Sequence, residues 1–253
     1  MQIRALLLDN STGPWHQMYQ NGVMKTWSSG THGQVSTSLY MGKKPKSILI
    51  NAMSNRVFNS RHLQKMWRYF QIRSDSNLIK CKEDAGIIQV DIPETWPNIT
   101  LKTLTAIRHV HIHHPYDFLI RANASCYVNL YALKNHLESL NGQFVYAGPK
   151  AINKDFISGW GIVLSHKTVE TLLHNEATNF LELFDDEAIG QMLKLSGIEP
   201  IAIPYIEISS LEELNTKARE ELAKFPFIRV KALDSGRRID DVLMCRIHEI
   251  LGE

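Results

Sequence analysis

Short apolar segments alternate with amphipathic segments along most of the chain. Runs of mainly aliphatic residues, bounded by polar and turn residues, predict strands at residues 3–8, 46–50, 87–92, 116–121 and 143–147. Between and after them, apolar side chains at helical spacing predict helices at residues 15–26, 61–70, 98–109, 129–140 and 167–175. The alternation predicts an α/β fold, with a mixed, mostly parallel sheet that carries helices on both faces.

The rest of the chain continues this pattern. A helix is predicted to begin at Asp185 and to end before Gly197, which suits the position after a helix C-terminus. Another amphipathic helix is predicted near residues 239–251. Residues 10–38 form the most loop-like region. The sequence contains no internal repeat and no clear linker, so we predict a single domain over residues 1–253.

Composition sets only broad bounds. The chain has 253 residues, 44% hydrophobic and 21% charged, as an ordinary globular protein has. A net charge of +2 does not require a nucleic-acid partner. Cys81, Cys126 and Cys245 are widely spaced and odd in number, so they predict neither a zinc motif nor a disulfide framework. No apolar run approaches the length of a membrane span, and we expect a cytoplasmic protein.

Residues 116–130 are the first candidate for a ligand site. A buried strand runs into the polar turn 121–125, a short apolar segment follows, and a helix begins near Asn129. Open α/β sheets build ligand sites where strands deliver small polar residues to their C-terminal ends. An ordinary strand–turn–helix corner is the alternative. Residues 9–11 follow the first strand in the same way and could equally be a simple turn.

Four segments in order resemble the β-1,3-galactosyltransferase and Fringe family of GT-A glycosyltransferases. The family motifs D-x-Y-x-N-L-T-x-K-T and K-T-D-D-D-V-F-V-N-L resemble ETWPNITLKT at 94–103 and RANASCYVNL at 121–130. The family's glycine-rich segment ending in L-S resembles SGWGIVLS at 158–165, and its acidic D-D-x-x-x-G element resembles DDEAIG at 185–190. An early R-x-T-W element resembles Lys25-Thr26-Trp27, so the resemblance spans about residues 20–200.

The resemblance implies a GT-A-like, Rossmann-like fold and transfer of a sugar from a nucleotide-sugar donor. We expect a UDP-linked donor and an inverting reaction. The hydroxyl acceptor would be a glycan or a hydroxymethylated base in phage DNA, and a DNA acceptor would make binding strongly dependent on salt. A catalytically silent nucleotide-sugar or glycan-binding module is the alternative.

One departure from the family concerns the cation. In the family, D-x-D carboxylates hold a divalent cation against the donor diphosphate, whereas this chain has Asn123-Ala124-Ser125, which supplies no negative charge. Three interpretations remain open: cationic side chains replace the metal, other ligands hold Mn²⁺ or Mg²⁺, or the protein binds without catalysing transfer. We therefore assign no metal ligand.

The resemblance and the strand ends together suggest the donor contacts. They comprise residues after the first strand, two cations in the segments that resemble the family, the turn that replaces D-x-D, and basic residues of the tail: Asp9, Asn10, Ser11, Lys102, Arg121, Asn123, Ser125, Arg229 and Lys231. The C-terminal segment 224–253, which also carries Arg237 and Arg238, would fold over the donor. A solvated basic face is the alternative for this tail.

Inverting transfer requires a general base for the acceptor hydroxyl. By resemblance Asp186 is this base and Asp185 is the second candidate, whereas an aspartate at a helix start is otherwise an ordinary N-cap. Gly159 and Gly161 would let the backbone approach a sugar, and Trp160 could stack on it; a tight bend and a core tryptophan are the alternatives.

A cluster of histidines lies between a predicted helix and a predicted strand. His109, His111, His113 and His114 could bind a metal if they shared one face of a strand. Their position favours a loop instead, so we do not expect a metal site there. Cys126, within an apolar run, is expected in the core.

Overall fold

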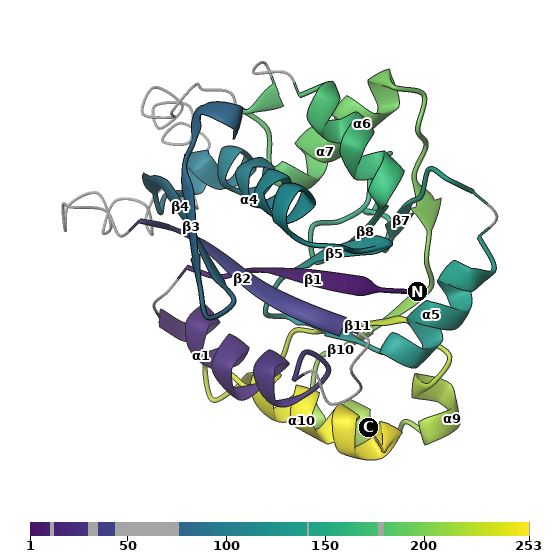
Figure 1. Cartoon of the computed structure of the whole chain (residues 1–253). Coiled ribbons are helices and arrows are strands. Elements are labelled where there is room, and N and C mark those ends of the chain that lie inside the picture. Colours follow the sequence, from purple (N-terminus) through teal and green to yellow (C-terminus); the bar gives the residue numbers. More distant parts are fainter. Residues whose placement is uncertain (11–12, 30–34, 44–75, 141, 177–179, 253) are drawn as a thin grey trace.

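The computed structural model describes residues 1–10, 13–29, 35–43, 76–140, 142–176 and 180–252. Its centre is an eight-stranded sheet in the order β3-β4-β2-β1-β5-β8-β7-β9 (Figure 1). In this spatial order the strands are Cys81–Asp84, Ile87–Pro93, Val35–Lys43, Ile3–Leu8, Phe118–Ala122, Gly161–Ser165, Tyr146–Gly148 and Ile201–Ala202.

The sheet is mixed and mostly parallel, as predicted. β1 lies between β2 and β5 and is parallel to both. The β2–β4 and β7–β9 pairs are also parallel, while β3–β4, β5–β8 and β7–β8 are antiparallel. The C-terminal ends of β4, β2, β1 and β5 therefore meet at one edge of the sheet.

Helices cover both faces of the sheet (Figure 1). One face packs against α4 (Ile99–His113), α6 (His166–His174) and α7 (Asp185–Leu195). The other is covered by α1 (Gly13–Asn21) and α5 (Leu130–Glu138), with α10 (Asp240–Leu251) farther out in the same apolar core. Because both faces are covered, central strands such as β1 are apolar at successive positions.

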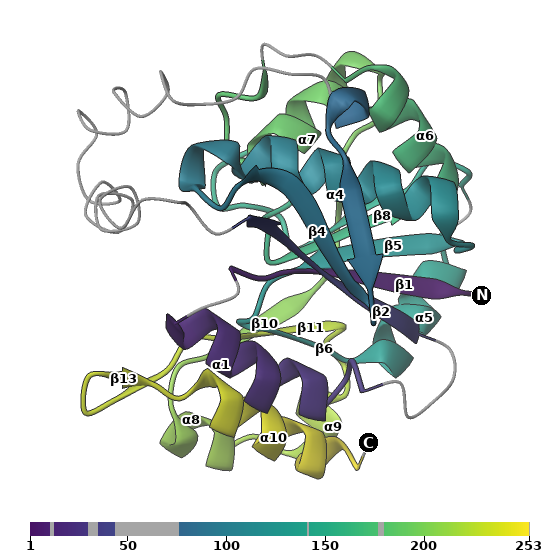
Figure 2. The same ribbon diagram turned by 60° about the vertical axis from the view of Figure 1, so that its left-hand side comes forward.

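A smaller sheet, β10-β11-β6, lies between the large sheet and α10 (Figure 2). Its strands are Tyr205–Ile208, Phe227–Val230 and Cys126–Val128. The segments that complete the described elements are β12 (Leu233–Asp234), β13 (Arg237–Arg238), α8 (Leu211–Asn215), α9 (Arg219–Leu222) and the 3₁₀ turns Val23–Lys25, Ser76–Leu78 and Trp96–Asn98. None of the helices in the described ranges is long and apolar enough to cross a bilayer.

The predicted strands at 3–8, 87–92 and 116–121 correspond to β1, β4 and β5. The helices predicted at 167–175, at Asp185 and at 239–251 correspond to α6, α7 and α10, and Gly197 follows α7 with a positive φ of 72°. The strand predicted at 143–147 begins later, at Tyr146. The segments predicted at 46–50 and 61–70 lie outside the described residues.

The prediction that residues 10–38 are mostly loop was wrong at its C-terminal end, where β2 begins at Val35 and lies between β1 and β4. Its polar residues are compatible with the sheet because Arg4 donates to two of them. Arg4 Nη1 lies 3.2 Å from Ser36 Oγ, and Nη2 lies 2.6 Å from Ser38 Oγ. Hydrogen bonds from Arg4 on the neighbouring strand thus satisfy the hydroxyl groups of Ser36 and Ser38, whose polar character predicts a loop from the sequence alone.

Candidate functional site

The candidate site forms where β1 and β5 end and β8 begins. Leu7 pairs with Ala122, and Ala122 pairs with Gly161, so Asp9, Asn123 and the glycine-rich loop reach the same edge of the sheet. The amide of Asp9 donates to the carbonyl of Tyr40 at 3.1 Å, and this hydrogen bond holds the residue that follows β1 against β2. Residues far apart in sequence are therefore brought together at the carboxyl ends of parallel strands.

Asp9 forms a carboxylate–imidazole pair with a residue that the sequence analysis missed. Its Oδ2 lies 2.7 Å from Nδ1 of His16 on α1, and its Oδ1 accepts the amide of Asn10 at 2.8 Å. The Asp9 side chain is buried, whereas the His16 ring is about one-third exposed at the same edge. A histidine on the first turn after a strand-end aspartate is the signal that could have identified His16. Ser11 lies outside the described residues.

Asn123 and Ser125, which replace the D-x-D carboxylates of the resembled family, form a local turn. Asn123 Oδ1 accepts the amide of Ser125 at 3.1 Å and its hydroxyl at 2.8 Å. This is the arrangement of an Asx turn, in which a side-chain oxygen organises the backbone that follows it. The amide oxygen that aligns with the first family carboxylate is thus engaged within the turn itself.

The C-terminal segment lies against this turn. Arg229 on β11 pairs with Cys126, and the amide of Val230 donates to the carbonyl of Ser125 at 2.9 Å. The Arg229 guanidinium lies 5.6 Å from the centre of the Trp160 ring and forms an ion pair of 2.9 Å with Glu207. Lys231 is exposed. Closure of this segment over a donor stays a prediction.

A second part of the same segment reaches the start of α1 (Figure 2). Arg238 on β13 lies with its guanidinium 5.0 Å from the centre of the Trp15 ring, and it forms an ion pair with Asp240. Trp15 precedes His16 in α1, so Arg238 contacts the helix turn that carries His16. The sequence analysis placed Arg238 in the basic tail, and the structure places it beside Trp15 at the start of α1.

The glycine-rich loop packs tightly against α7 and β11. The amide of Gly159 donates to Asp186 Oδ2 at 2.9 Å, and a Cβ atom at Gly159 would lie 2.9 Å from Arg121 Nη1. At Gly161 a Cβ atom would lie 2.9 Å from the Phe227 ring. A side chain at either position would collide with these groups, which explains why both residues are glycines. Contact of either glycine with a sugar stays a prediction.

Trp160, between these glycines, is 5% exposed. Its ring meets Tyr205 edge-on, with centroids 5.1 Å apart, and Phe227 in the same way at 6.2 Å. With Arg229 near its face as well, the indole packs as a core residue at the rim of the candidate site. Its stacking on a sugar stays a prediction.

Asp185 and Asp186 begin α7 and have different partners. The N-cap residue is Phe184, so the alternative that either aspartate is the N-cap was wrong. Asp185 Oδ2 forms a buried ion pair of 2.5 Å with Arg121 Nη2 and accepts the hydroxyl of Thr103 at 2.9 Å. Asp186 instead accepts amide hydrogens of Gly159 and Glu187, both at 2.9 Å. Asp185 is therefore charge-compensated, and Asp186 faces the glycine-rich loop.

The surroundings of Asp186 favour its protonated form more than water does. Burial, followed by the neighbouring Asp185 carboxylate, raises the pKa of Asp186, although the Gly159 amide and Arg121 act in the opposite direction. A carboxylate with a raised pKa is a stronger proton acceptor than an ordinary aspartate. Asp186 thus has the electrostatic properties of a general base.

Arg121 and Lys102, both predicted to bind the donor, are buried next to carboxylates. Arg121 is also hydrogen-bonded through Nε to the Tyr40 hydroxyl, at 3.2 Å. Although burial disfavours the charged guanidinium, Asp185 keeps the pKa of Arg121 above its ordinary value. Lys102 forms an ion pair with Glu94, and its ammonium lies 5.8 Å from the Tyr40 ring centre. For both cations, the donor-binding role stays a prediction.

Among the described residues, the group with suitable geometry for a metal lies away from this edge. It consists of Glu83, His109 and His114. The expectation that the histidines lie in a loop was wrong, because α4 continues to His113 and His114 is its C-cap.

No protein-family model and no curated protein matches the sequence. Solved structures with similarity to this chain include the galactosyltransferase LgtC in complex with donor and acceptor sugar analogs. Its TM-score is 0.48 at 7% identity, covering 97% of this chain and 95% of that one. A glycosyltransferase involved in glycosylation of the major capsid of PBCV-1 has a TM-score of 0.43 at 11% identity, covering 96% and 99%. Mouse xyloside xylosyltransferase 1 has a TM-score of 0.40 at 8% identity, covering 90% and 96%.

The buried Arg121–Asp185 pair predicts an asymmetric effect on stability. Arg121→Met leaves the Asp185 carboxylate buried without its cation, and we expect a loss of about 3–5 kcal/mol in the free energy of unfolding. The double variant Arg121→Met/Asp185→Leu removes both charges and should lose less. Urea denaturation measures both. Equal losses of unfolding free energy in the single and double variants would contradict the explanation that the single variant is destabilised by an uncompensated charge.

Proposed function

We propose that the chain is a glycosyltransferase that moves a sugar from a nucleotide-sugar donor to a hydroxyl acceptor. The observation that carries the proposal is the position of Asp186. This carboxylate lies at the sheet edge where β1 and β5 end, receives the Gly159 amide, and has a raised pKa. The ordered resemblance of the sequence to glycosyltransferase motifs supports the same conclusion.

In the proposed reaction, Asp186 accepts the proton of the acceptor hydroxyl as its oxygen attacks the anomeric carbon of the donor sugar. A bond forms between this carbon and the acceptor oxygen, and the bond to the diphosphate oxygen breaks. The nucleoside diphosphate leaves with the bonding electron pair. Attack on the face opposite the leaving group inverts the anomeric configuration, for which a single general base is sufficient.

We place the nucleotide between the end of β1 and the turn at Asn123. Asp9 and Asn10 offer hydrogen-bonding groups for a nucleoside, which we expect to be uridine. The diphosphate requires positive charge, for which we propose Arg229, beside the turn, and Arg238, beside Trp15; each would exchange its present carboxylate partner, Glu207 or Asp240, for the phosphate oxygens. Guanidinium groups bind phosphate oxygens through paired hydrogen bonds, so arginines can take over part of the role of a cation.

The turn at residues 123–125 does not fit a D-x-D-type cation site. Asn123 and Ser125 are neutral and hydrogen-bonded to each other, and the nearby Asp9 carboxylate is paired with His16. Mn²⁺ and Mg²⁺ are held mainly by carboxylate, carbonyl and water oxygens. We therefore propose donor binding that does not depend on a divalent cation.

The turn at residues 123–125 is also compatible with a second function. A protein that binds a nucleotide sugar or a glycan without transferring it would need neither a cation nor a base. Asn123 is used for structure, which suits such a module, whereas the raised pKa of Asp186 has no role in it. The acceptor would be a glycan or a hydroxymethylated DNA base. Transfer assays that offer each of the two to the same enzyme preparation distinguish between them.

Calorimetric titration with nucleoside diphosphates and nucleotide sugars, each with Mn²⁺ and with a chelator, tests donor binding. We expect one nucleotide to bind equally well under both conditions, because arginines compensate the diphosphate charge. Binding only with Mn²⁺ would contradict the cation-independent site. An absence of binding under both conditions would overturn the proposed donor site.

Replacement of the proposed base separates transfer from binding. Asp186→Asn keeps the shape of the side chain but removes the proton acceptor, and we expect transfer to fall by about 10²–10⁴-fold. Donor affinity should change by less than about twofold. Glu187→Gln, on the next residue of the same helical turn, is the matched control. If both variants transfer sugar at the wild-type rate, Asp186 is not the base.

The pH dependence of transfer reports the same carboxylate. Asp186 accepts a proton only when it is ionised, so kcat/KM should rise with pH and level off above the pKa of Asp186. Because burial and Asp185 raise this pKa, the midpoint should lie above the ordinary aspartate value of about 3.9. A midpoint at or below that value in the pH profile of kcat/KM would contradict the assignment.

A further inference from the structure

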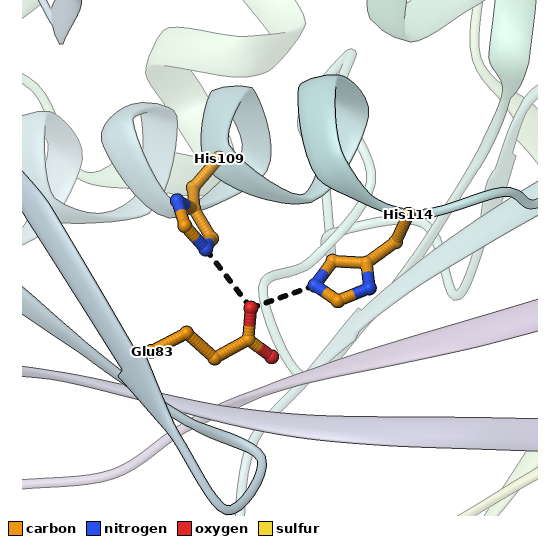
Figure 3. A group of neighbouring side chains, drawn as sticks. All are labelled: Glu83, His109 and His114. Atoms are coloured by element: carbon orange, nitrogen blue, oxygen red, sulfur yellow. Dashed lines mark hydrogen bonds and ion pairs between the residues drawn. The ribbon is translucent and has the colours of Figure 1, made fainter.

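Two histidines and a glutamate converge at the other end of the sheet (Figure 3). Glu83 lies on the edge strand β3 and pairs with Ile88, where β4 begins. His109 lies one turn before the end of α4, and His114 is its C-cap. Nε2 of His109 is 2.9 Å, and Nε2 of His114 is 2.7 Å, from the same Oε2 atom of Glu83. One ligand atom from each residue thus lies within 4.8 Å of the other two.

The end of α4 is what brings both rings to one carboxylate. In a continuous helix, residues five apart point about 140° away from each other around the axis. His114 instead leaves the helix with an extended backbone (φ −132°, ψ 136°), while the helix ends at His113. Its ring returns to the side of His109, and the two ring centroids are 6.2 Å apart.

Neighbouring polar groups orient the Glu83 carboxylate so that its Oε2 atom points toward the two histidines. Its other oxygen, Oε1, lies 3.6 Å from Arg4 Nη2 and 3.5 Å from the Ser38 hydroxyl, which orient the carboxylate from behind. Ligating carboxylates in metal sites are commonly oriented by such outer hydrogen bonds. The C-terminal end of α4 also carries partial negative charge, which stabilises a nearby cation. The positive charge of Arg4 opposes this effect, but it faces Oε1 rather than the histidine side.

We propose that Glu83, His109 and His114 bind a zinc ion. Two imidazole nitrogens and one carboxylate oxygen are an established ligand combination for zinc, and imidazole disfavours Mg²⁺ and Ca²⁺. Tetrahedral bonds of about 2.0–2.1 Å place ligand atoms about 3.3 Å apart. The distances from Oε2 to the two nitrogens would therefore lengthen by roughly half an ångström as the ion replaces the two Nε2 protons, one on each imidazole. The fourth position is left for water.

The three side chains are accessible but partly shielded. Their exposed fractions are 21% for Glu83, 14% for His109 and 22% for His114. An ion can thus enter from solvent and remain partly covered by the edge strand and the helix. Bound zinc would connect β3, which is the edge strand of the large sheet within the described residues, to the end of α4. The site lies away from Asp186, whose hydrogen-bond partners are Gly159 and Glu187, so none of the three ligands contacts the proposed base.

Zinc titration of the full chain, after treatment with a chelator, tests the site. With a chromophoric chelator as competitor, we expect one equivalent of zinc to bind. Glu83→Gln and His114→Gln should each weaken this binding at least tenfold, because each removes one ligand. His113→Gln is the matched control, since its ring lies 4.6 Å from the His109 ring but outside the ligand set. This control should bind zinc as the wild type does.

A second measurement guards against a variant that binds poorly because it folds poorly. Zinc should raise the Tm of the wild type and of His113→Gln, because the ion binds the folded chain. The same addition should leave the Tm of folded His114→Gln unchanged. Equal zinc affinity in the wild type and both ligand variants would assign the ion to other histidines and overturn the proposal. A wild type that binds no zinc would overturn it as well.

Discussion

The buried ion pair between Arg121 and Asp185 is the constraint on which the candidate site depends. The two side chains are 3% and 5% exposed, so neither charge is tolerable there without the other. Thr103 and Tyr40 complete the network: the Tyr40 hydroxyl lies 2.9 Å from Thr103 Oγ1. Burial raises the pKa of Tyr40 to about 12, so this phenol stays protonated and can hydrogen-bond within the network at neutral pH. The network joins β2, β5, α4 and α7, and it thereby holds Asp186, the next residue of α7, against the glycine-rich loop.

The same principle explains why polar residues lie inside this sheet. Each buried cation is placed beside oxygen atoms: Arg4 contacts Ser36, Ser38 and Glu83, while Lys102 is paired with Glu94. A polar group in the interior is stable when such partners are present and costly when they are absent. Both arrangements cross from one chain segment to another, so they fix which strands and helices are neighbours as well as compensating charge.

The sequence predicted the elements whose patterns are local. β1 and β5 are covered on both faces and appear as apolar runs, and α6, α7 and α10 repeat apolar residues at helical spacing. It missed β2, because the suitability of Ser36 and Ser38 depends on Arg4, 32 and 34 residues away. By resemblance it proposed Asp186, and after it Asp185, as the base, but it could not predict that Arg121, 64 residues earlier on β5, compensates the charge of Asp185.

The helix α4 relates the two ends of the molecule. Its first turns carry Lys102 and Thr103, which contact the network beneath the proposed base, and its last turn and C-cap carry the histidines that meet Glu83. Thr103 precedes His109 by 6 residues and His114 by 11, which is about 9 and 16 Å along the helix axis, so direct electrostatic interaction between the two groups is weakened by screening over about 8–10 Å. A charge bound at the histidines would therefore influence Asp186 mainly through the position of α4. The Thr103–Asp185 hydrogen bond and the apolar core also hold α4 in place, so the zinc site would add support to the fold and would take no part in the transfer chemistry.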